Sequence, residues 1–363
     1  MKNKKFWIMV AAIAIATVAF FVLSSGRKMT DDRPVVRIGA SLPLTGDLAP
    51  IGNVIKESLV MALSEIPVDS KYRYKIIFED DQYDMKKIVT NANRLISIRN
   101  VDAMLFMFDG SNVSAPIAER REIPSLGCTW GADFFKDYEY SFNHWSRPET
   151  QAAAFVLLMK DENIKTISII AQHSANITEL MKAVEKQAKQ NNIKLNPINY
   201  VNIDVKDFRM EITRMKKQQP DAVMIMLLDP QITIFAKQAA EQNLNIRFTS
   251  IDEIAHTPNK ELLEGSIFVS SITGGDDFQE RFAKHTNLSM KSCASNLYDW
   301  FKIIVDIFES SDHRLTGEEL KNRIYQIKNF PSAMGIEISV DKDGIIDTPL
   351  FRARIKDGKV AKE

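Results

Sequence analysis

Apolar positions along the chain follow two periods that alternate from residue 35 onward. The run 35–42 is mostly apolar, which predicts a buried strand. In the stretch that follows, Ile55, Leu59 and Leu63 recur at helical spacing and predict a helix over 53–65. Because strands that alternate with helices of about 10–15 residues form βαβ units, this pattern predicts a parallel sheet covered by helices.

The alternation continues in two blocks. In the first, the pattern predicts strands at 74–78, 103–108 and 125–128 and helices at 85–98 and 113–121. In the second, which begins after Pro148, it predicts strands at 166–171, 195–201, 222–228 and 248–251 and helices at 150–159, 177–190, 208–217 and 232–242. A strand at 267–270, a long helix at 293–309 and a terminal hairpin of 336–340 with 350–355 complete the chain. Two blocks of similar pattern predict an α/β fold of two doubly wound lobes with a cleft between them.

The N-terminus carries an export signal. Lys2, Lys4 and Lys5 precede an apolar run at 6–23, and a basic segment followed by such a run directs export. The run is also near the lower length limit of a membrane-spanning helix. Residues 1–28 are therefore either a cleaved signal peptide or a retained transmembrane anchor, with membrane contact through 6–23 in the second case. Both alternatives place the remaining residues in the periplasm.

Composition narrows the classes of partner. At 363 residues the chain exceeds one core of ordinary size, which agrees with two lobes. Its 47 basic residues balance 47 acidic ones, and no basic block occurs. A neutral chain of this kind gives no electrostatic reason to expect nucleic acid as a partner.

A search for catalytic or metal-binding patterns finds none. The five histidines are scattered without the spacing of metal ligands, and no phosphate-binding loop or nucleophile elbow occurs. The two cysteines, Cys128 and Cys293, form no C-x-x-C pair; we interpret them as buried thiols and leave a disulfide open. The sequence therefore predicts a protein with no cofactor and no metal, and not an enzyme.

Four segments resemble the periplasmic Leu/Ile/Val-binding protein family. They are the strand and loop 38–46 with Gly52, the acidic turn 79–84, the helix and strand segment 115–124, and the closing segment 334–344. Together they span nearly all of the chain after residue 34. The resemblance implies the type I periplasmic binding protein fold, in which a hinge of three crossovers joins the lobes. The first lobe would be 34–146 with 272–330, and the second 147–271 with 331–357.

The resemblance also implies a ligand site on the first lobe. A carboxylate needs N–H donors, and Gly110 and Ser111 open a helix whose N-terminus supplies them. Ser111 is either a ligand contact or only a helix cap. The resemblance implies further contacts from the loops after the first and fourth strands. The first-lobe candidates are Thr45, Ile51, Gly110, Ser111, Thr129 and Trp130.

On the second lobe, the resemblance implies an acidic residue that accepts the ligand's ammonium group. Asp252 occupies the matching position, with Glu253 beside it as the rival. Where many family members carry ligand-stacking aromatic rings, this chain has Ile51, Asn176 and Leu228-Asp229. We therefore expect contacts from Asn176 and Asp252 and do not assign a branched-chain amino acid as the ligand.

The predicted function is capture of an amino acid, an amide or a related small solute. The resemblance implies delivery to a membrane permease and ATPase complex, as in an ABC-type importer. The alternative is a membrane-anchored sensor that uses the same clamp to signal to a partner protein, which a retained segment 6–23 would favour.

Overall fold

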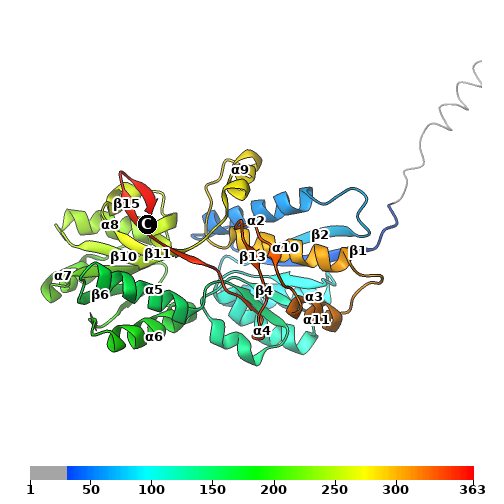
Figure 1. Cartoon of the computed structure of the whole chain (residues 1–363), viewed down its shortest axis with the longest axis horizontal. Coiled ribbons are helices and arrows are strands. Elements are labelled where there is room, and N and C mark those ends of the chain that lie inside the picture. The colour runs from blue at the N-terminus through cyan, green and yellow to red at the C-terminus, as the bar shows by residue number, and fades with distance from the viewer. Residues whose placement is uncertain (1–30) are drawn as a thin grey trace, which may run out of the picture.

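Two β-sheets, each flanked by helices, lie side by side along the longest axis of the molecule (Figure 1). The computed structural model describes residues 31–363, without the side chains of 132–134. The signal or anchor predicted for 1–28, including the span 6–23, lies outside the described residues. Within 31–363, no helix is long and apolar enough to cross a membrane.

The first lobe is built on a parallel sheet of six strands in the order β14-β5-β4-β3-β1-β2. Its strands are β1 (Val35–Leu42), β2 (Arg73–Asp80), β3 (Ala103–Leu105), β4 (Ser125–Gly127), β5 (Ser141–His144) and β14 (Ile345–Ile346). Its helices are α2 (Ala49–Ser64), α3 (Met85–Ser97), α4 (Asp109–Arg121), the 3-10 helix η1 (Ala132–Asp137), α9 (Asp276–His285), α10 (Ala294–Glu309) and α11 (Gly317–Tyr325). A separate antiparallel pair joins β12 (Phe330–Pro331) to β13 (Glu337–Ile338).

The second lobe is built on an eight-stranded sheet in the order β16-β15-β11-β10-β9-β6-β7, with β8 also pairing with β6. Its strands are β6 (Thr166–Gln172), β7 (Lys194–Leu195), β8 (Asn199–Val201), β9 (Ala222–Met226), β10 (Arg247–Ile251), β11 (Ile267–Ser271), β15 (Leu350–Lys356) and β16 (Lys359–Lys362). Its helices are α5 (Pro148–Asp161), α6 (Ala175–Gln190), α7 (Arg209–Gln218), α8 (Gln231–Glu241) and the 3-10 helices η2 (Glu253–His256) and η3 (Lys260–Leu263). The β11–β15 and β15–β16 pairs are antiparallel and the others parallel.

Local sequence sets several helix starts. The Asp84 carboxylate accepts hydrogen bonds from two N–H groups of the first turn of α3, and the Ser174 hydroxyl accepts one from the main-chain N–H of Ile177 in α6. Thr316 and Glu319 form a reciprocal capping box on α11. These side chains satisfy N–H groups that have no partner inside the helix, so each fixes where its helix begins.

The chain crosses between the lobes at 145–147, 272–275 and 347–349, which are the gaps between elements of different sheets. The predicted boundary at 331 is wrong, because β14 pairs in parallel with β5 of the first lobe. The predicted hairpin of 336–340 with 350–355 is also wrong. β13 pairs with β12, whereas β15 pairs with β11 and β16.

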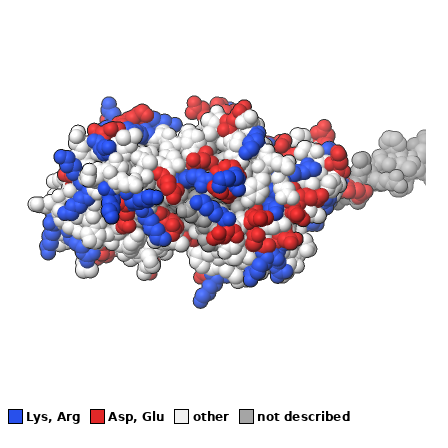
Figure 2. Space-filling view, turned by 60° about the horizontal axis from the view of Figure 1, so that its bottom comes forward, with Lys and Arg blue, Asp and Glu red and all other residues white. Residues whose placement is uncertain are grey.

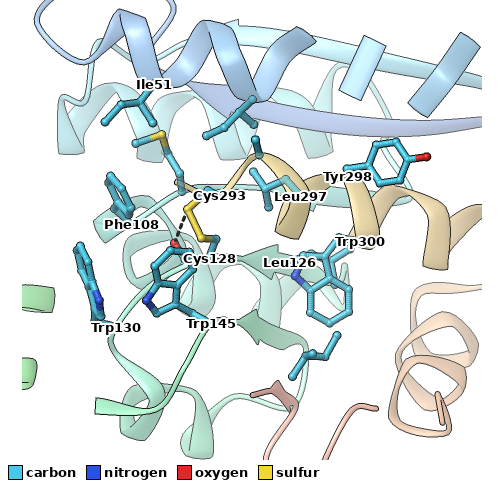
Figure 3. Close-up of a cluster of buried hydrophobic side chains, with 14 of the residues drawn as sticks. Ile51, Phe108, Leu126, Cys128, Trp130, Trp145, Cys293, Leu297, Tyr298 and Trp300 are labelled. Carbon is cyan, nitrogen blue, oxygen red and sulfur yellow. Dashed lines mark hydrogen bonds between the residues drawn. A yellow bond between two sulfur atoms is a disulfide. The ribbon is translucent and has the colours of Figure 1, made fainter. Parts of the chain in front are cut away.

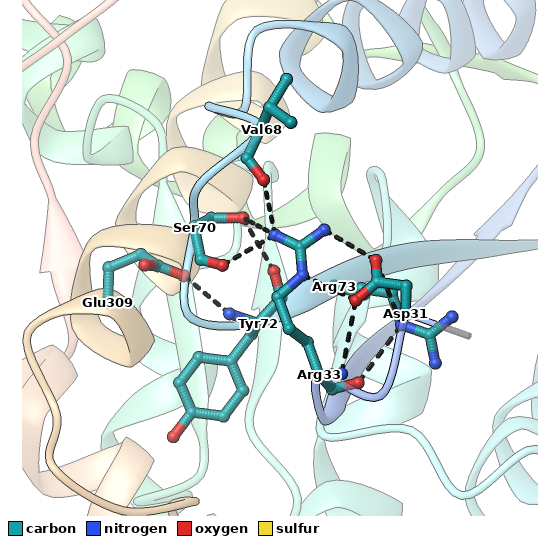
Figure 4. Close-up of polar contacts among 7 residues, drawn as sticks. All are labelled: Asp31, Arg33, Val68, Ser70, Tyr72, Arg73 and Glu309. Atoms are coloured by element: carbon teal, nitrogen blue, oxygen red, sulfur yellow. Dashed lines mark hydrogen bonds and ion pairs between the residues drawn. The ribbon is translucent and has the colours of Figure 1, made fainter. Parts of the chain in front are cut away.

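Residues 31–33, the first that the structure describes, bind to the first lobe near the amino end of β1. The Arg33 guanidinium donates to the carbonyl oxygens of Val68 (2.8 Å) and Ser70 (2.7 Å) and pairs with Asp31 (Figure 4). The carboxyl end of β1, which leads to the loop between the lobes, is at the other end of the strand. On the face shown in Figure 2, basic and acidic side chains are mixed over both lobes, in keeping with the balanced composition.

Candidate functional site: two cavities between the lobes

The carboxyl ends of the parallel strands of both sheets meet at the junction of the lobes. Both sheets have the flavodoxin-like strand order, in which ligands bind beyond the carboxyl ends of the strands where the order reverses. The loops after β1 and β3 therefore face those after β6 and β9. Two cavities lie in this junction, and each is lined by residues of both lobes.

The small cavity has a volume of about 420 Å³ and a largely apolar wall with a few charged groups. The first lobe supplies the loop and helix start after β1 and part of the loop before α10. The second lobe supplies residues after β9 and β10. The lining residues are Gly46, Asp47, Pro50, Ile51, Asp229, Pro230, Thr233, Glu253, His256, Pro258, Asn259, Lys291 and Ser292.

Glu253 is the buried acid of this cavity. Glu253 is only 4% exposed, and its Oε1 atom has no hydrogen-bond partner among the described residues. Burial raises the pKa of Glu253 well above its usual range; the negative charges of Asp252 and Asp229 raise it further, and the positive charge of Lys291 opposes them. A buried carboxyl with an unpaired oxygen is suited to receive N–H donors from a cation.

Two basic residues, His256 and Lys291, line the same cavity. Lys291 of the first lobe donates from Nζ to the main-chain oxygen of His256 at 2.6 Å, so this hydrogen bond joins the lobes. Burial, with the charges of Lys291 and Lys260, lowers the pKa of His256 to about 3. His256 is therefore neutral near pH 7, while the Lys291 ammonium keeps two further N–H groups.

The large cavity, of about 1100 Å³, lies across the junction from residues that follow β2 and β3 to residues that follow β6 and β8. Asp109 is its buried acid: the carboxylate accepts hydrogen bonds from the Tyr83 hydroxyl (3.1 Å) and from the main-chain N–H of Asn176 (3.2 Å). Burial raises the pKa of Asp109. Both of its oxygens thus have protein partners, unlike Oε1 of Glu253.

A tryptophan lies at the centre of the junction. The indole Nε1 of Trp130, which follows β4, donates to Oδ2 of Asp252, which follows β10, at 3.2 Å. Its ring stacks on Phe108 with centroids 5.4 Å apart and meets Trp145 edge-on (Figure 3). Trp130 is 2% exposed and Asp252 is fully buried, so this contact closes the junction between the two lobes.

The Asp252 carboxylate already accepts hydrogen bonds from other residues of the protein. Besides Trp130, its carboxylate accepts from the main-chain N–H of Ser271 (2.5 Å) and from Nε2 of Gln151 (2.6 Å). Burial raises the pKa of Asp252, and these donors oppose that shift. Of the two rival acids, Asp252 accepts three hydrogen bonds from the protein, whereas Glu253 lines the small cavity and its Oε1 atom has no partner within residues 31–363.

A disulfide joins Cys128 to Cys293, so the interpretation as thiols is wrong. The bond links the end of β4 to the residue before α10 and is buried beneath the Trp130 loop (Figure 3). The two cysteines are far apart in sequence, and only the fold brings them together.

Of the predicted site residues, Ile51 lines the small cavity. Asn176 is buried in the junction, where its Oδ1 accepts from Asn112 of the first lobe at 2.8 Å. Exposed Thr45 donates its hydroxyl hydrogen to the Asp80 carboxylate (2.6 Å).

Gly110 and Ser111 line neither cavity, whereas their neighbours on α4, Asp109, Asn112 and Val113, line the large one. Gly110 and Ser111 are buried inside the first turn of α4, and the N-cap residue is Phe108, so Ser111 does not cap the helix. The Ser111 side chain lies against Gly127, where a Cβ would come within 2.4 Å of its hydroxyl oxygen. Thr129 is held by two main-chain hydrogen bonds to the Asn143 amide, both 2.9 Å.

Several lining residues were not predicted. Asp229 was noted only as the replacement of an aromatic ring, and its position after β9 could have suggested a cavity residue. Asp47, His256 and Lys291 lie in loops or a single 3-10 turn. No periodic signal marks such positions.

Comparison with known proteins identifies the family. A family model described as periplasmic binding protein matches residues 35–359. The chain belongs to the periplasmic binding protein family. This confirms the resemblance and the type I fold that it implied.

Among curated relatives, the chain is similar to Leu/Ile/Val-binding protein homolog 2 of Brucella abortus (strain 2308), with 25% identity over 231 residues. The match covers 60% of this chain and 61% of the relative, so the chain matches less than two thirds of that protein's length.

Solved structures of family members share the fold. A leucine binding protein, LivK, from Thermotoga maritima MSB8 has a TM-score of 0.80 at 19% identity, covering 90% of this chain and 97% of that one. A solute binding protein of an ABC transporter from Rhodopseudomonas palustris BisB5, in complex with 3,4-dihydroxybenzoic acid, has a TM-score of 0.80 at 17% identity, covering 91% and 96%. LivJ from Streptococcus pneumoniae, in complex with isoleucine, has a TM-score of 0.78 at 15% identity, covering 91% and 100%. The ligands named for these proteins differ in chemistry, so the shared fold does not assign one to this chain.

Proposed function

We propose that this protein is an extracytoplasmic solute-binding protein that holds a small amino-acid-like molecule in the small cavity for an ABC-type importer. Glu253 carries the proposal. It is a buried acid on a cavity shared by both lobes, and one of its oxygens has no partner among the described residues. A ligand ammonium would supply the missing donors and the opposite charge.

Lys291 is suited to bind the carboxylate of an amino acid. Its ammonium lines the same cavity and uses one hydrogen bond on the His256 carbonyl, which leaves donors for a carboxylate. Because Lys291 and Glu253 come from different lobes, a zwitterion between them would hold the lobes together. This replaces the α4 helix start as the expected carboxylate site and Asp252 as the expected ammonium site.

Further observations support an exported transport protein. A buried disulfide is typical of proteins that fold in oxidising compartments such as the periplasm. One structure that shares the fold is a solute binding protein of an ABC transporter. The volume of about 420 Å³ is at the lower end of small-molecule sites, which favours a small solute.

The test is a thermal-shift screen of amino acids, amides, amines and small carboxylates, followed by titration of the variant Glu253→Gln. Loss of a charge-assisted hydrogen bond is expected to weaken binding of an ammonium ligand by roughly 10- to 100-fold. Glu261→Gln, in the same lobe but on an exposed residue outside the cavity, is the matched control and should bind like the wild type. Equal affinity in wild type and Glu253→Gln would remove Glu253 from the site, and no shift with any amino compound would overturn the ligand class.

A further inference from the structure

Trp130 lines neither cavity, but its contacts lead toward both. On one side its N–H group binds Asp252, the chain neighbour of Glu253 in the small cavity. On the other side its ring stacks on Phe108, whose ring in turn meets the edge of Tyr83 in the large cavity.

The surrounding structure holds the indole rigidly. Phe108 stacks on one face with an angle of 13° between the rings, and Trp145 packs edge-on. Figure 3 shows Phe108, Trp130 and Trp145 next to one another. A stacked, hydrogen-bonded ring that is 2% exposed has no free space to rotate into.

The backbone next to Trp130 also reaches the large cavity. A Cβ on Gly131 would lie 3.1 Å from the Asn112 amide and 3.3 Å from Oδ1 of Asn176, the pair that bridges the lobes beside the large cavity. A larger residue at position 131 would therefore make these Asn side chains shift by a few tenths of an ångström. The loop that carries Trp130 thus packs against the Asn112–Asn176 pair.

We infer that Trp130 is a specificity-determining residue: its indole divides the space between the lobes and confines the ligand to the small cavity. The inference rests on the proposed function, and adds to it a limit on ligand length. A ligand side chain that exceeds the small cavity would meet the Trp130–Asp252 contact behind the cavity wall. A larger molecule would have to displace an indole that is held by a hydrogen bond and two rings.

The experiment compares wild type with Trp130→Ala and Trp130→Phe over straight-chain α-amino acids of increasing length: alanine, norvaline, norleucine and longer homologues. In the wild type, affinity should fall once the side chain exceeds the small cavity. Trp130→Ala should bind the long homologues at least roughly ten-fold more tightly than the wild type does. Trp130→Phe keeps a ring stacked on Phe108 and should keep the length limit. An unchanged length limit in Trp130→Ala would overturn the inference.

A structure of Trp130→Ala gives a second, ligand-independent result. One continuous cavity is expected, and two separate cavities would overturn the inference whatever the ligand is. If Trp130→Ala fails to fold, as judged by circular dichroism, Trp130→Leu takes its place in both measurements. Failure of the wild type to bind any amino acid would count against the proposed function, while the cavity in the variant would still decide the role of Trp130.

Discussion

Adjacent residues on this chain have different roles because their surroundings differ. Asp252 and Glu253 follow the same strand, and both are buried. Asp252 receives donors from Ser271, Gln151 and Trp130, and is thus part of the contact between the lobes. Glu253 lines the small cavity, and its Oε1 atom has no hydrogen-bond partner among the described residues. The carboxylate that lacks a protein partner is the one available to a ligand.

The raised pKa of Glu253 predicts that binding depends on pH. Without ligand, burial and the neighbouring carboxylates favour the protonated acid. A bound ammonium favours the ionised form, so binding releases a proton. Affinity should therefore increase as pH rises toward the pKa of the free protein's Glu253 and weaken as pH falls. Calorimetric titration in buffers of different ionisation enthalpy measures the released proton, and Glu253→Gln should release none from this position. Equal proton release in both proteins would contradict the assignment.

At the scale of elements, the disulfide fixes the loop that carries Trp130. It joins the end of β4 to the start of α10, a helix whose residues are mostly buried in the first lobe. The loop between Cys128 and Trp130 is short, so little freedom remains for the indole. The disulfide and the ring stack together position the residue that meets Asp252.

Removing this bond should lower stability. The disulfide closes a loop with a sequence separation of 165 residues, and the variant Cys128→Ala/Cys293→Ala should lose about 2–5 kcal/mol, since a long closed loop restricts the unfolded chain. The midpoint of denaturant unfolding, with and without reductant, measures the loss. The wild type under reducing conditions serves as the comparison. Identical midpoints for oxidised wild type and variant would contradict a stabilising disulfide.

The sequence predicted elements better than it predicted their partners. Strands and helices with clear periods, such as β1 and α10, were found near their true bounds. The two-residue strand β14 was missed because so short a segment has no period, and its pairing with β5 moved the last crossing from 331 to 347–349. The partner of β15 could not be found from neighbouring sequence, since β11 lies far away along the chain.

The site was predicted less well than the fold, for a similar reason. Ile51 lines the small cavity from the first turn of α2, the helix that follows the first strand, and its contact with a ligand stays a prediction. Ser111 was misplaced, since a helix that begins one turn earlier buries its side chain against Gly127. Lys291 reaches the cavity only because α9 and α10 return the chain to the junction. Which of two neighbouring acids faces a cavity depends on contacts that no local pattern contains.

At the scale of the whole molecule, two similar lobes form one binding unit. Three crossings connect them, and contacts such as Trp130–Asp252, Asn112–Asn176 and Lys291–His256 bridge the junction. Each of these contacts has one partner in each lobe, so a change in the angle between the lobes would break them together. Hinge motion of this kind is how two-lobed proteins admit and enclose a ligand.

The most direct test is a crystal structure with the strongest ligand from the thermal-shift screen. We predict that the ligand lies in the small cavity, with its ammonium within hydrogen-bond distance of the Glu253 carboxylate and with Trp130 still bound to Asp252. A ligand in the large cavity, or one whose ammonium contacts Asp252 in place of Trp130, would contradict it.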